Sequence, residues 1–174
     1  ADAFLDEAKY DDVSGYSEPS ESAHDFFCIG HTSTSVSLAC GLAKARDLAD
    51  ENYNVIAVIG DGSLSGGEAL EGLDFAKELN GNLIVVVNDN EMSIAENHGG
   101  LYENLKLLRD TKGQAECNIF KAMGLNYVFV EDGNDLTQLI DAFKRVKDSK
   151  APVAVHIHTL KGKGYTLAEE NKES

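Results

Sequence analysis

Short unbroken runs of apolar residues alternate with stretches of helical periodicity along most of this chain. The runs from Val55 to Ile59 and from Leu83 to Val87 are rich in valine and isoleucine, which is typical of parallel strands covered on both faces. Between them, apolar residues recur at helical spacing and charged residues fill much of the opposite face, which predicts an amphipathic helix. Its apolar positions are Leu70, Leu73, Ala76 and Leu79. Strand, helix and strand at this spacing predict a right-handed βαβ crossover.

The same periodicity extends to both sides of this unit. It predicts further helices at 32–50, 101–108, 118–123 and 136–148, and further strands at 127–130 and 153–158. The resulting fold class is α/β, a three-layer sandwich with a mostly parallel central sheet flanked by helices.

The beginning of the chain has a different character. Residues 1–29 are acidic and polar without strong periodicity. We expect them to form an extended lead-in that belongs to the same domain as residues 30–174.

Polar motifs follow the first two strands. Gly60-Asp61-Gly62 ends the first strand and Asn88-Asp89-Asn90 ends the next, and ligands of open α/β sheets bind at these carboxyl ends. The glycines let backbone N–H groups approach phosphate oxygens. Carboxylate and amide oxygens, here from Asp61 and Asn90, suit Mg²⁺, with Ca²⁺ or Mn²⁺ able to substitute. A lone Gly-Asp-Gly is also typical of an ordinary strand-to-helix turn, but the second motif favours a cation and diphosphate site.

Composition narrows the functional classes. A chain of 174 residues suits one domain, and its net charge of −15 argues against nucleic-acid and anionic membrane partners. No apolar run is long enough to span a bilayer. The three cysteines are odd in number and lack metal-binding spacing, so we expect buried free thiols and a cytoplasmic location.

The motif GDGSLSGGEALEGL followed by NDNEMSI resembles the thiamine diphosphate motif of the transketolase superfamily. Its wording is similar to that of the 1-deoxy-D-xylulose-5-phosphate synthase family. Further matching segments occur in order along nearly the whole chain. They are SES at 20–22 with Asp25, GHTSTS at 30–35, VEDGND at 130–135, and KGKGY at 161–165 followed by Ala168-Glu169.

This resemblance implies thiamine diphosphate and Mg²⁺ as cofactors. It implies Asp61, the Asn90 side chain and the Met92 carbonyl as metal ligands. It also implies a cofactor-binding set made of Gly30, His31, Thr32, Asp61, Gly62, Ser63, Asn90 and Tyr165, with the tyrosine near the thiazolium side. His31 is carried over as the catalytic candidate. Taken by itself, His31 is either a phosphate or substrate ligand or an ordinary turn histidine.

In the resembled family, pyruvate and glyceraldehyde 3-phosphate give 1-deoxy-D-xylulose 5-phosphate and CO₂, and the product serves isoprenoid, thiamine and pyridoxal biosynthesis. The glutamate that activates the cofactor lies in the family's pyrimidine-binding domain, and we expect that domain and the C-terminal domain to be absent from this chain. We therefore expect this chain alone to be inactive and to need that domain, in cis or as a separate chain. We also expect a homodimer, exposed apolar surface where the missing domain would pack, and chain ends that are cuts within a longer protein.

One departure from the family pattern keeps alternatives open. The family carries a long insertion after its Asn-Asp-Asn loop, whereas the 97–120 segment here is short, which leaves the acceptor substrate open. The alternatives are a transketolase or transketolase-like N-terminal subunit with another ketol donor, a 2-oxo acid dehydrogenase α-type subunit, and a non-catalytic thiamine diphosphate-binding or scaffold domain. A dinucleotide-binding fold is disfavoured, because the first strand is not followed by Gly-x-Gly-x-x-Gly.

A pair of histidines ends the last predicted strand. His156 and His158 share one face of it by the period of two. We interpret them mainly as strand-end packing and not as a metal pair.

Overall fold

The computed structural model describes residues 6–92 and 97–170. The chain divides into two compact units, residues 1–32 and residues 33–174. The prediction that the lead-in belongs to the same domain as residues 30–174 stays a prediction.

The first unit is not simply extended. It contains a 3-10 helix, η2 (Glu7–Asp12). The Ile29 N–H donates a hydrogen bond of 3.2 Å to the Ser17 carbonyl, which closes a loop between these residues. The prediction of an extended lead-in is therefore wrong for these segments, because local hydrogen bonds fold the polar chain back on itself.

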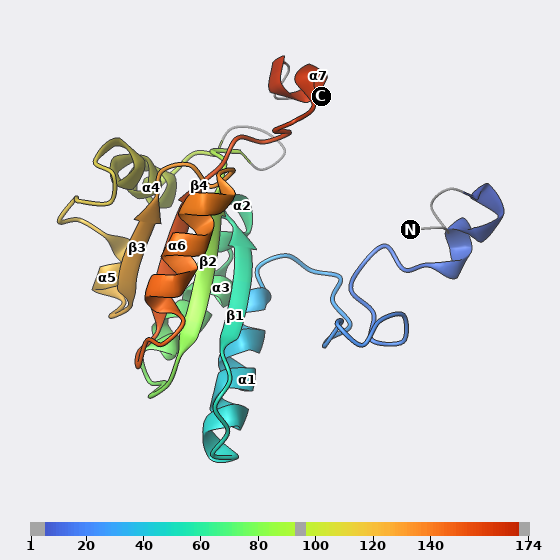
Figure 1. The fold of residues 1–174 in the computed structure, drawn as a ribbon, viewed down its shortest axis with the longest axis horizontal. Helices are drawn as coiled ribbons and strands as arrows, with labels where there is room; N and C mark the ends of the chain where they lie inside the picture. Colours follow the sequence, from blue (N-terminus) through green and yellow to red (C-terminus); the bar gives the residue numbers. More distant parts are fainter. Residues whose placement is uncertain (1–5, 93–96, 171–174) are drawn as a thin grey trace. The chain divides into compact units, whose positions relative to one another are not determined.

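The second unit is built around a sheet of four parallel strands (Figure 1). In spatial order the strands are β1 (Val55–Gly60), β2 (Leu83–Asp89), β4 (Val153–His158) and β3 (Asn126–Val130). Successive strands are joined through helices, as parallel pairing requires. The central strands β2 and β4 are buried along most of their length. This confirms the predicted α/β class and the parallel sheet.

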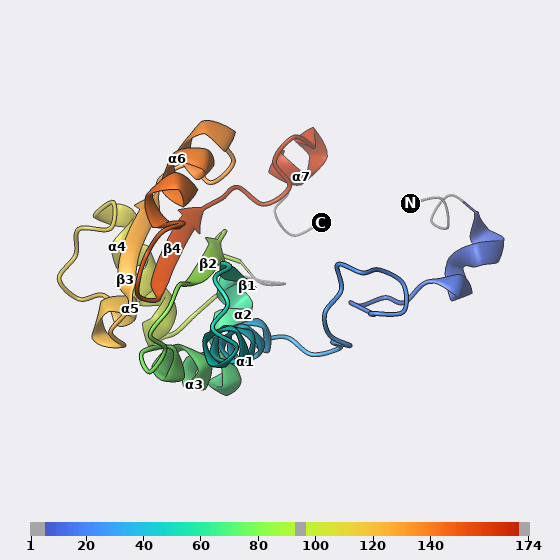
Figure 2. The same cartoon turned by 60° about the horizontal axis from the view of Figure 1, so that its bottom comes forward.

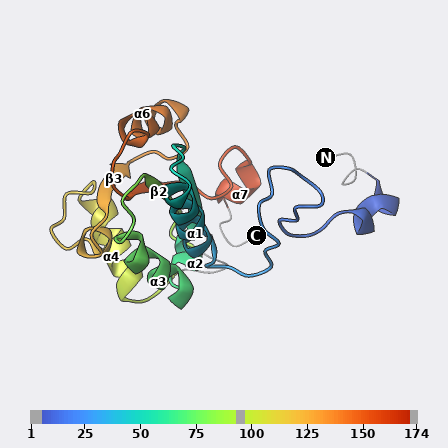
Figure 3. The ribbon, with the colours of Figure 1, turned by 90° about the horizontal axis from the view of Figure 1, so that it is seen from below.

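Helices cover both faces of the sheet (Figures 2 and 3). The helices that share a core with one face include α1 (Ser35–Leu48), α3 (Gly67–Ala76), α4 (Gly100–Asp110) and α5 (Ile119–Ala122). On the opposite face, α6 (Leu136–Val146) packs on a separate core formed by β2, β3 and β4. The predicted three-layer sandwich is therefore confirmed.

The face under α6 is covered less completely than the other. Alternate residues of β1 point to opposite faces, and Ile56 and Val58 on this side are 52% and 61% exposed. Leu136 and Ile140 of α6 are also largely exposed. The prediction that this strand is covered on both faces is therefore wrong for the side under α6, and the coverage of this side by a missing domain stays a prediction.

The strand register brings the polar strand ends together. Gly60 pairs with Asn88 on β2, and Asp89 pairs with His158 on β4. The short helix α2 (Asp61–Leu64) begins at this edge of the sheet. A last short helix, α7 (Thr166–Glu170), follows the segment after β4. Within the described ranges, no helix combines the length and apolar character that crossing a membrane requires.

Candidate functional site

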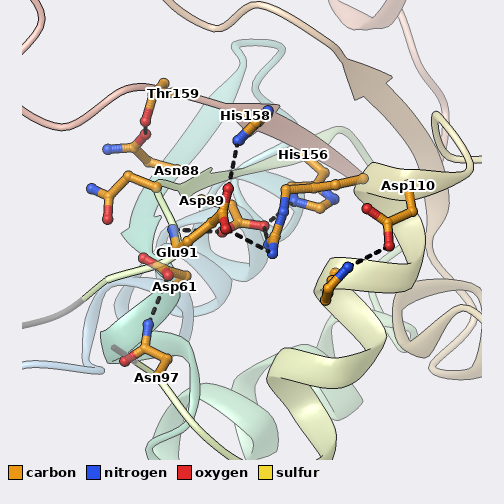
Figure 4. Close-up of polar contacts among 12 residues, drawn as sticks. Asp61, Asn88, Asp89, Glu91, Asn97, Asp110, His156, His158 and Thr159 are labelled. Carbon is orange, nitrogen blue, oxygen red and sulfur yellow. Dashed lines mark hydrogen bonds and ion pairs between the residues drawn. The ribbon is translucent and has the colours of Figure 1, made fainter. Parts of the chain in front are cut away.

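Asp61 is the first residue of α2 and follows β1 directly. Gly60 precedes it in an extended conformation, with φ −76° and ψ 154°, so the strand ends there and the helix begins. The Asp61 side chain is buried, with 2% of the residue exposed. Asn97 donates a hydrogen bond of 2.8 Å from Nδ2 to Asp61 Oδ2 (Figure 4). The predicted metal ligand therefore lies at the carboxyl edge of the sheet, with one oxygen bonded to a neutral amide.

The surroundings of Asp61 disfavour its negative charge. Burial raises the pKa of Asp61, and the nearby Asp89 carboxylate raises this pKa further. Hydrogen bonds from Asn97 and the Gly62 backbone offset the effect only in part. Among the described residues, no basic side chain forms an ion pair with Asp61. Because a divalent cation stabilises a buried carboxylate of this kind, the site fits Mg²⁺.

Asn90 and Met92 lie in a tight loop directly after β2. The Met92 N–H donates a hydrogen bond of 3.1 Å to Asn90 Oδ1, so the predicted ligand oxygen faces its own loop. An amide oxygen has two lone pairs, and one of them remains for a metal ion. The residue Met92 is buried, with 7% exposed.

Two cavities border this loop. One of about 320 Å³ is lined by Asp61 and Met92 together with residues of α4. The second, of about 330 Å³, is lined by Asn90 and Met92 with Lys161 and Lys163 from the segment after β4. The structure therefore brings Asp61 and Met92 to one cavity and Asn90 and Met92 to its neighbour, with Met92 common to both.

Three further residues of the predicted cofactor set lie in the second unit. Gly62 and Ser63 are half-buried in α2. The Ser63 carbonyl accepts a hydrogen bond of 2.7 Å from Ser33 Oγ, which ties α2 to the chain just before α1. Tyr165 is 62% exposed, so its ring is accessible to a ligand. Their contacts with a cofactor stay predictions.

The remaining members of that set are Gly30, His31 and Thr32, which belong to the first unit. His31 Nδ1 lies 2.7 Å from the Thr32 carbonyl oxygen. That local contact agrees with both interpretations of His31, as a ligand of phosphate or substrate and as a turn histidine. The catalytic role of His31 stays a prediction.

Asp89 and His156 form a buried pair that sequence reasoning missed. Both side chains are 0% exposed, and Asp89 Oδ2 lies 2.8 Å from His156 Nε2. Burial alone would raise the pKa of Asp89, but hydrogen bonds from His156 and Arg109 hold this pKa below its ordinary value. The side chain of His158 contacts Glu91 at 3.1 Å. His156 packs against aromatic rings at the end of β4, as the packing interpretation predicts, but each histidine also contacts a carboxylate, which that interpretation does not include.

A sequence signal for this pair did exist. A buried polar side chain requires hydrogen-bond partners, and His156 lies within an otherwise apolar strand. Its partner Asp89 is 67 residues away in sequence, and only the pairing of β2 with β4 shows which residue it is.

The metal assignment stays a prediction. Among the side chains that the structure describes, no group of three or more His, Cys, Asp or Glu residues could hold a metal ion. The predicted ligand set is not of that kind, since of Asp61, Asn90 and Met92 only the first is one of these residue types.

The family model described as 1-deoxy-D-xylulose-5-phosphate synthase matches residues 1–117 and 107–159. A 1-deoxy-D-xylulose-5-phosphate synthase from Pelotomaculum thermopropionicum is 41% identical over 92% of this chain and 31% of its own length. One from Clostridium beijerinckii is 39% identical over 94% of this chain and 32% of its own length. The 1-deoxy-D-xylulose-5-phosphate synthase 1 from Geobacter metallireducens is 41% identical over 91% of this chain and 31% of its own length.

These matches also bear on length. The chain spans about a third of the relatives that it matches. The first alignment runs over 196 positions although the chain has 174 residues, so that relative contains residues that this chain lacks. The two family matches overlap at 107–117, inside the segment predicted to be shortened. With most of its residues matched by the family model, this chain belongs to the 1-deoxy-D-xylulose-5-phosphate synthase family.

Proposed function

We propose that this chain is the diphosphate- and Mg²⁺-binding half of a thiamine diphosphate-dependent 1-deoxy-D-xylulose-5-phosphate synthase. The reaction joins pyruvate and glyceraldehyde 3-phosphate with release of CO₂. The observation that carries the proposal is the buried Asp61 carboxylate, which lacks a cationic partner among the described residues and lies next to the loop after β2. Membership of the family supports the same cofactor.

Each residue has a distinct role in this proposal. Asp61, the Asn90 side chain and the Met92 carbonyl bind Mg²⁺, for which oxygen ligands and substrate phosphates are suited. The residues that line the diphosphate are Gly30, His31, Thr32, Gly62 and Ser63, and Tyr165 lies on the thiazolium side. When bound, thiamine diphosphate supplies the carbon nucleophile and electron sink for decarboxylation. The work of this chain is to bind and orient that group.

The proposal includes partners. The glutamate that activates the cofactor would come from a pyrimidine-binding domain, in cis or on a separate chain, within a cytoplasmic homodimer. This chain alone would then be inactive. An assay of CO₂ release from pyruvate with thiamine diphosphate and Mg²⁺ tests this, and turnover well above a protein-free blank would contradict it.

The test of the site is calorimetric titration of thiamine diphosphate into the full-length protein, with and without Mg²⁺. We expect binding that depends on Mg²⁺ and is lost in Asp61→Ala. The matched control is Asp74→Ala, which removes an exposed carboxylate from α3 and leaves binding unchanged. Equal Mg²⁺-dependent binding by wild type and Asp61→Ala would show that Asp61 is not a ligand.

A second candidate function is a non-catalytic scaffold domain that binds thiamine diphosphate. The divided family match around 107–117 favours it, because the segment shortened there borders the cavity at Asp61. Two results would favour the scaffold function over the synthase. The full-length protein would bind thiamine diphosphate tightly without synthase activity, and Asp61→Ala would leave the scaffold function unchanged.

A further inference from the structure

The two oxygens of the Asp89 carboxylate have different partners (Figure 4). Oδ2 accepts hydrogen bonds from Arg109 Nη1 at 2.5 Å and His156 Nε2 at 2.8 Å, which come from α4 and β4. Oδ1 accepts the backbone N–H of Glu91 at 3.1 Å. One oxygen therefore connects Asp89 to the sheet and to α4, and the other connects it to the loop after β2.

Through His156, hydrogen bonds link side chains of three neighbouring strands of the sheet. The Tyr127 hydroxyl lies 2.8 Å from His156 Nδ1, and that nitrogen accepts when Nε2 carries the proton that faces Asp89. Tyr127, His156 and Asp89 belong to β3, β4 and β2, which are neighbouring strands. Phe129 packs edge-on against the imidazole, with ring centroids 5.2 Å apart. Packing and hydrogen bonds thus fix the orientation of His156.

The loop contains a backbone conformation that needs support. Glu91 has φ +69°, in the left-handed region that is unfavourable for residues other than glycine. Its carboxylate lies 3.1 Å from His158 Nε2 and 3.6 Å from Arg109 Nη2. Arg109 therefore contacts both Asp89 and Glu91, with one nitrogen directed to each.

We infer that Asp89, His156 and Arg109 are positioning residues that fix the shape of the loop at 89–92 before a metal ion binds. The inference rests on the proposed function, in which this loop supplies two of the metal ligands. None of the three positioning residues is itself a ligand. They act through the loop, as second-layer partners of metal sites generally do.

The loop's own hydrogen bonds fix its shape. Asp89 holds the N–H of Glu91, and the turn at Glu91 sets the directions of the Asn90 side chain and the Met92 carbonyl. Ligands that are ordered beforehand lose less conformational freedom on binding, which strengthens binding. Because three donors occupy the Asp89 oxygens, this carboxylate is also restrained from replacing Asp61 as the ligand.

Asp89→Asn in the full-length protein tests the inference. Asparagine keeps the shape of the side chain but removes one of the two carboxylate oxygens. We expect hydrogen exchange of peptides covering the loop, measured by mass spectrometry without metal, to become faster while peptides from α3 are unchanged. With thiamine diphosphate present, Mn²⁺ affinity measured by electron paramagnetic resonance falls by about tenfold or more, the usual effect of removing such a partner.

Substitutions of Arg109 provide a conservative comparison. Arg109→Lys keeps a cation beside Asp89, whereas Arg109→Met keeps only the apolar stem. We expect Mn²⁺ affinity close to wild type in the first and about tenfold weaker in the second. Arg145→Met on α6, where the side chain is exposed, is the control and leaves both readouts unchanged. A purely structural role would instead lower the unfolding temperature of the Arg109 variants equally, without separating their Mn²⁺ affinities.

Each result of these experiments supports or overturns the positioning role of Asp89, His156 and Arg109. Unchanged loop exchange in Asp89→Asn, or unchanged Mn²⁺ affinity beside a wild type that binds Mn²⁺, overturns the inference. If wild type itself binds no Mn²⁺ with thiamine diphosphate, the proposed function fails, and the exchange comparison still decides whether Asp89 fixes the loop. If Asp89→Asn does not fold, the two Arg109 variants supply both readouts.

Discussion

Asn97 donates its side-chain amide to the carboxylate of Asp61 at 2.8 Å, although 36 residues separate them in sequence. This amide is neutral, so it satisfies one lone pair of the carboxylate without balancing its charge. The surroundings of Asp61 therefore disfavour its negative charge, as the raised pKa of this carboxyl group indicates.

The first prediction concerns stability without ligand. Asp61→Asn removes the disfavoured charge and keeps an oxygen for the Asn97 amide. We expect the metal-free protein to gain up to roughly 1 kcal/mol in unfolding free energy, while Mg²⁺-dependent binding of thiamine diphosphate is lost. Thermal unfolding with and without Mg²⁺ measures both effects. Asp74→Asn is the exposed control, and a clear loss of stability in metal-free Asp61→Asn would argue against the electrostatic account.

The second prediction compares two helical glycines. A Cβ at Gly72 on α3 would lie 2.9 Å from the backbone nitrogen of Ser37 on α1, too close to be accommodated without a shift. A Cβ at Gly41 on α1 would instead lie in open space. We expect Gly72→Ala to destabilise the fold by about 1–3 kcal/mol through overpacking.

Gly41→Ala is the matched control. It should stabilise the fold by roughly 0.5–1 kcal/mol, because alanine is the better helix former. Urea unfolding of both variants measures the two effects, and shifts of the same sign would contradict the close approach of α1 and α3.

The third prediction concerns alkaline pH. Burial raises the pKa of the Cys40 thiol from 9.0 to about 11. Between these pH values the unfolded thiol loses its proton while the folded thiol keeps it, so stability falls as pH rises. We expect a loss of roughly 2–3 kcal/mol from this group between pH 9 and pH 11.

Unfolding in urea at several pH values, beside Cys40→Ala, isolates this contribution. Tyr127, whose pKa burial also raises, contributes to both proteins and cancels in the comparison. Parallel pH curves for wild type and Cys40→Ala would disprove the assignment to Cys40.

The fourth prediction concerns the hydrogen bond between the Tyr127 hydroxyl and His156, whose other ring nitrogen contacts Asp89. Tyr127→Phe leaves the buried His156 Nδ1 without its hydroxyl partner. A buried nitrogen left without a partner costs about 1–3 kcal/mol, and we expect that loss in urea unfolding. Tyr53→Phe is the control, since Tyr53 is 48% exposed. Equal stabilities of the two variants would show that the Tyr127 hydroxyl contributes nothing.

The agreement between the sequence-based predictions and the structure differs from one element to another. The first strand, predicted at 55–59, is Val55–Gly60, and the helix predicted at 101–108 is Gly100–Asp110. The strand prediction depends on an unbroken apolar run and the helix prediction on local periodicity, and a sequence displays both directly. Burial of individual side chains was predicted less well. All three cysteines were expected to be buried, but Cys28 and Cys117 are exposed and only Cys40 is buried.

The site shows the same division. The positions of Asp61 and Asn90 after adjacent parallel strands were predictable, because parallel strands end at one edge of the sheet. Their actual partners were not, since Asn97 and the Met92 N–H reach them through loop conformations that follow no period.

The family, the strand and helix pattern, and the strand ends that carry polar side chains all follow from local features of the sequence. The burial of Asp89 between Arg109 and His156 and the left-handed conformation of Glu91 become visible only in the folded chain. Periodicity indicates only which face of a helix or strand packs on the core. Which charges meet inside the core depends on strand register and helix packing between residues far apart in the chain.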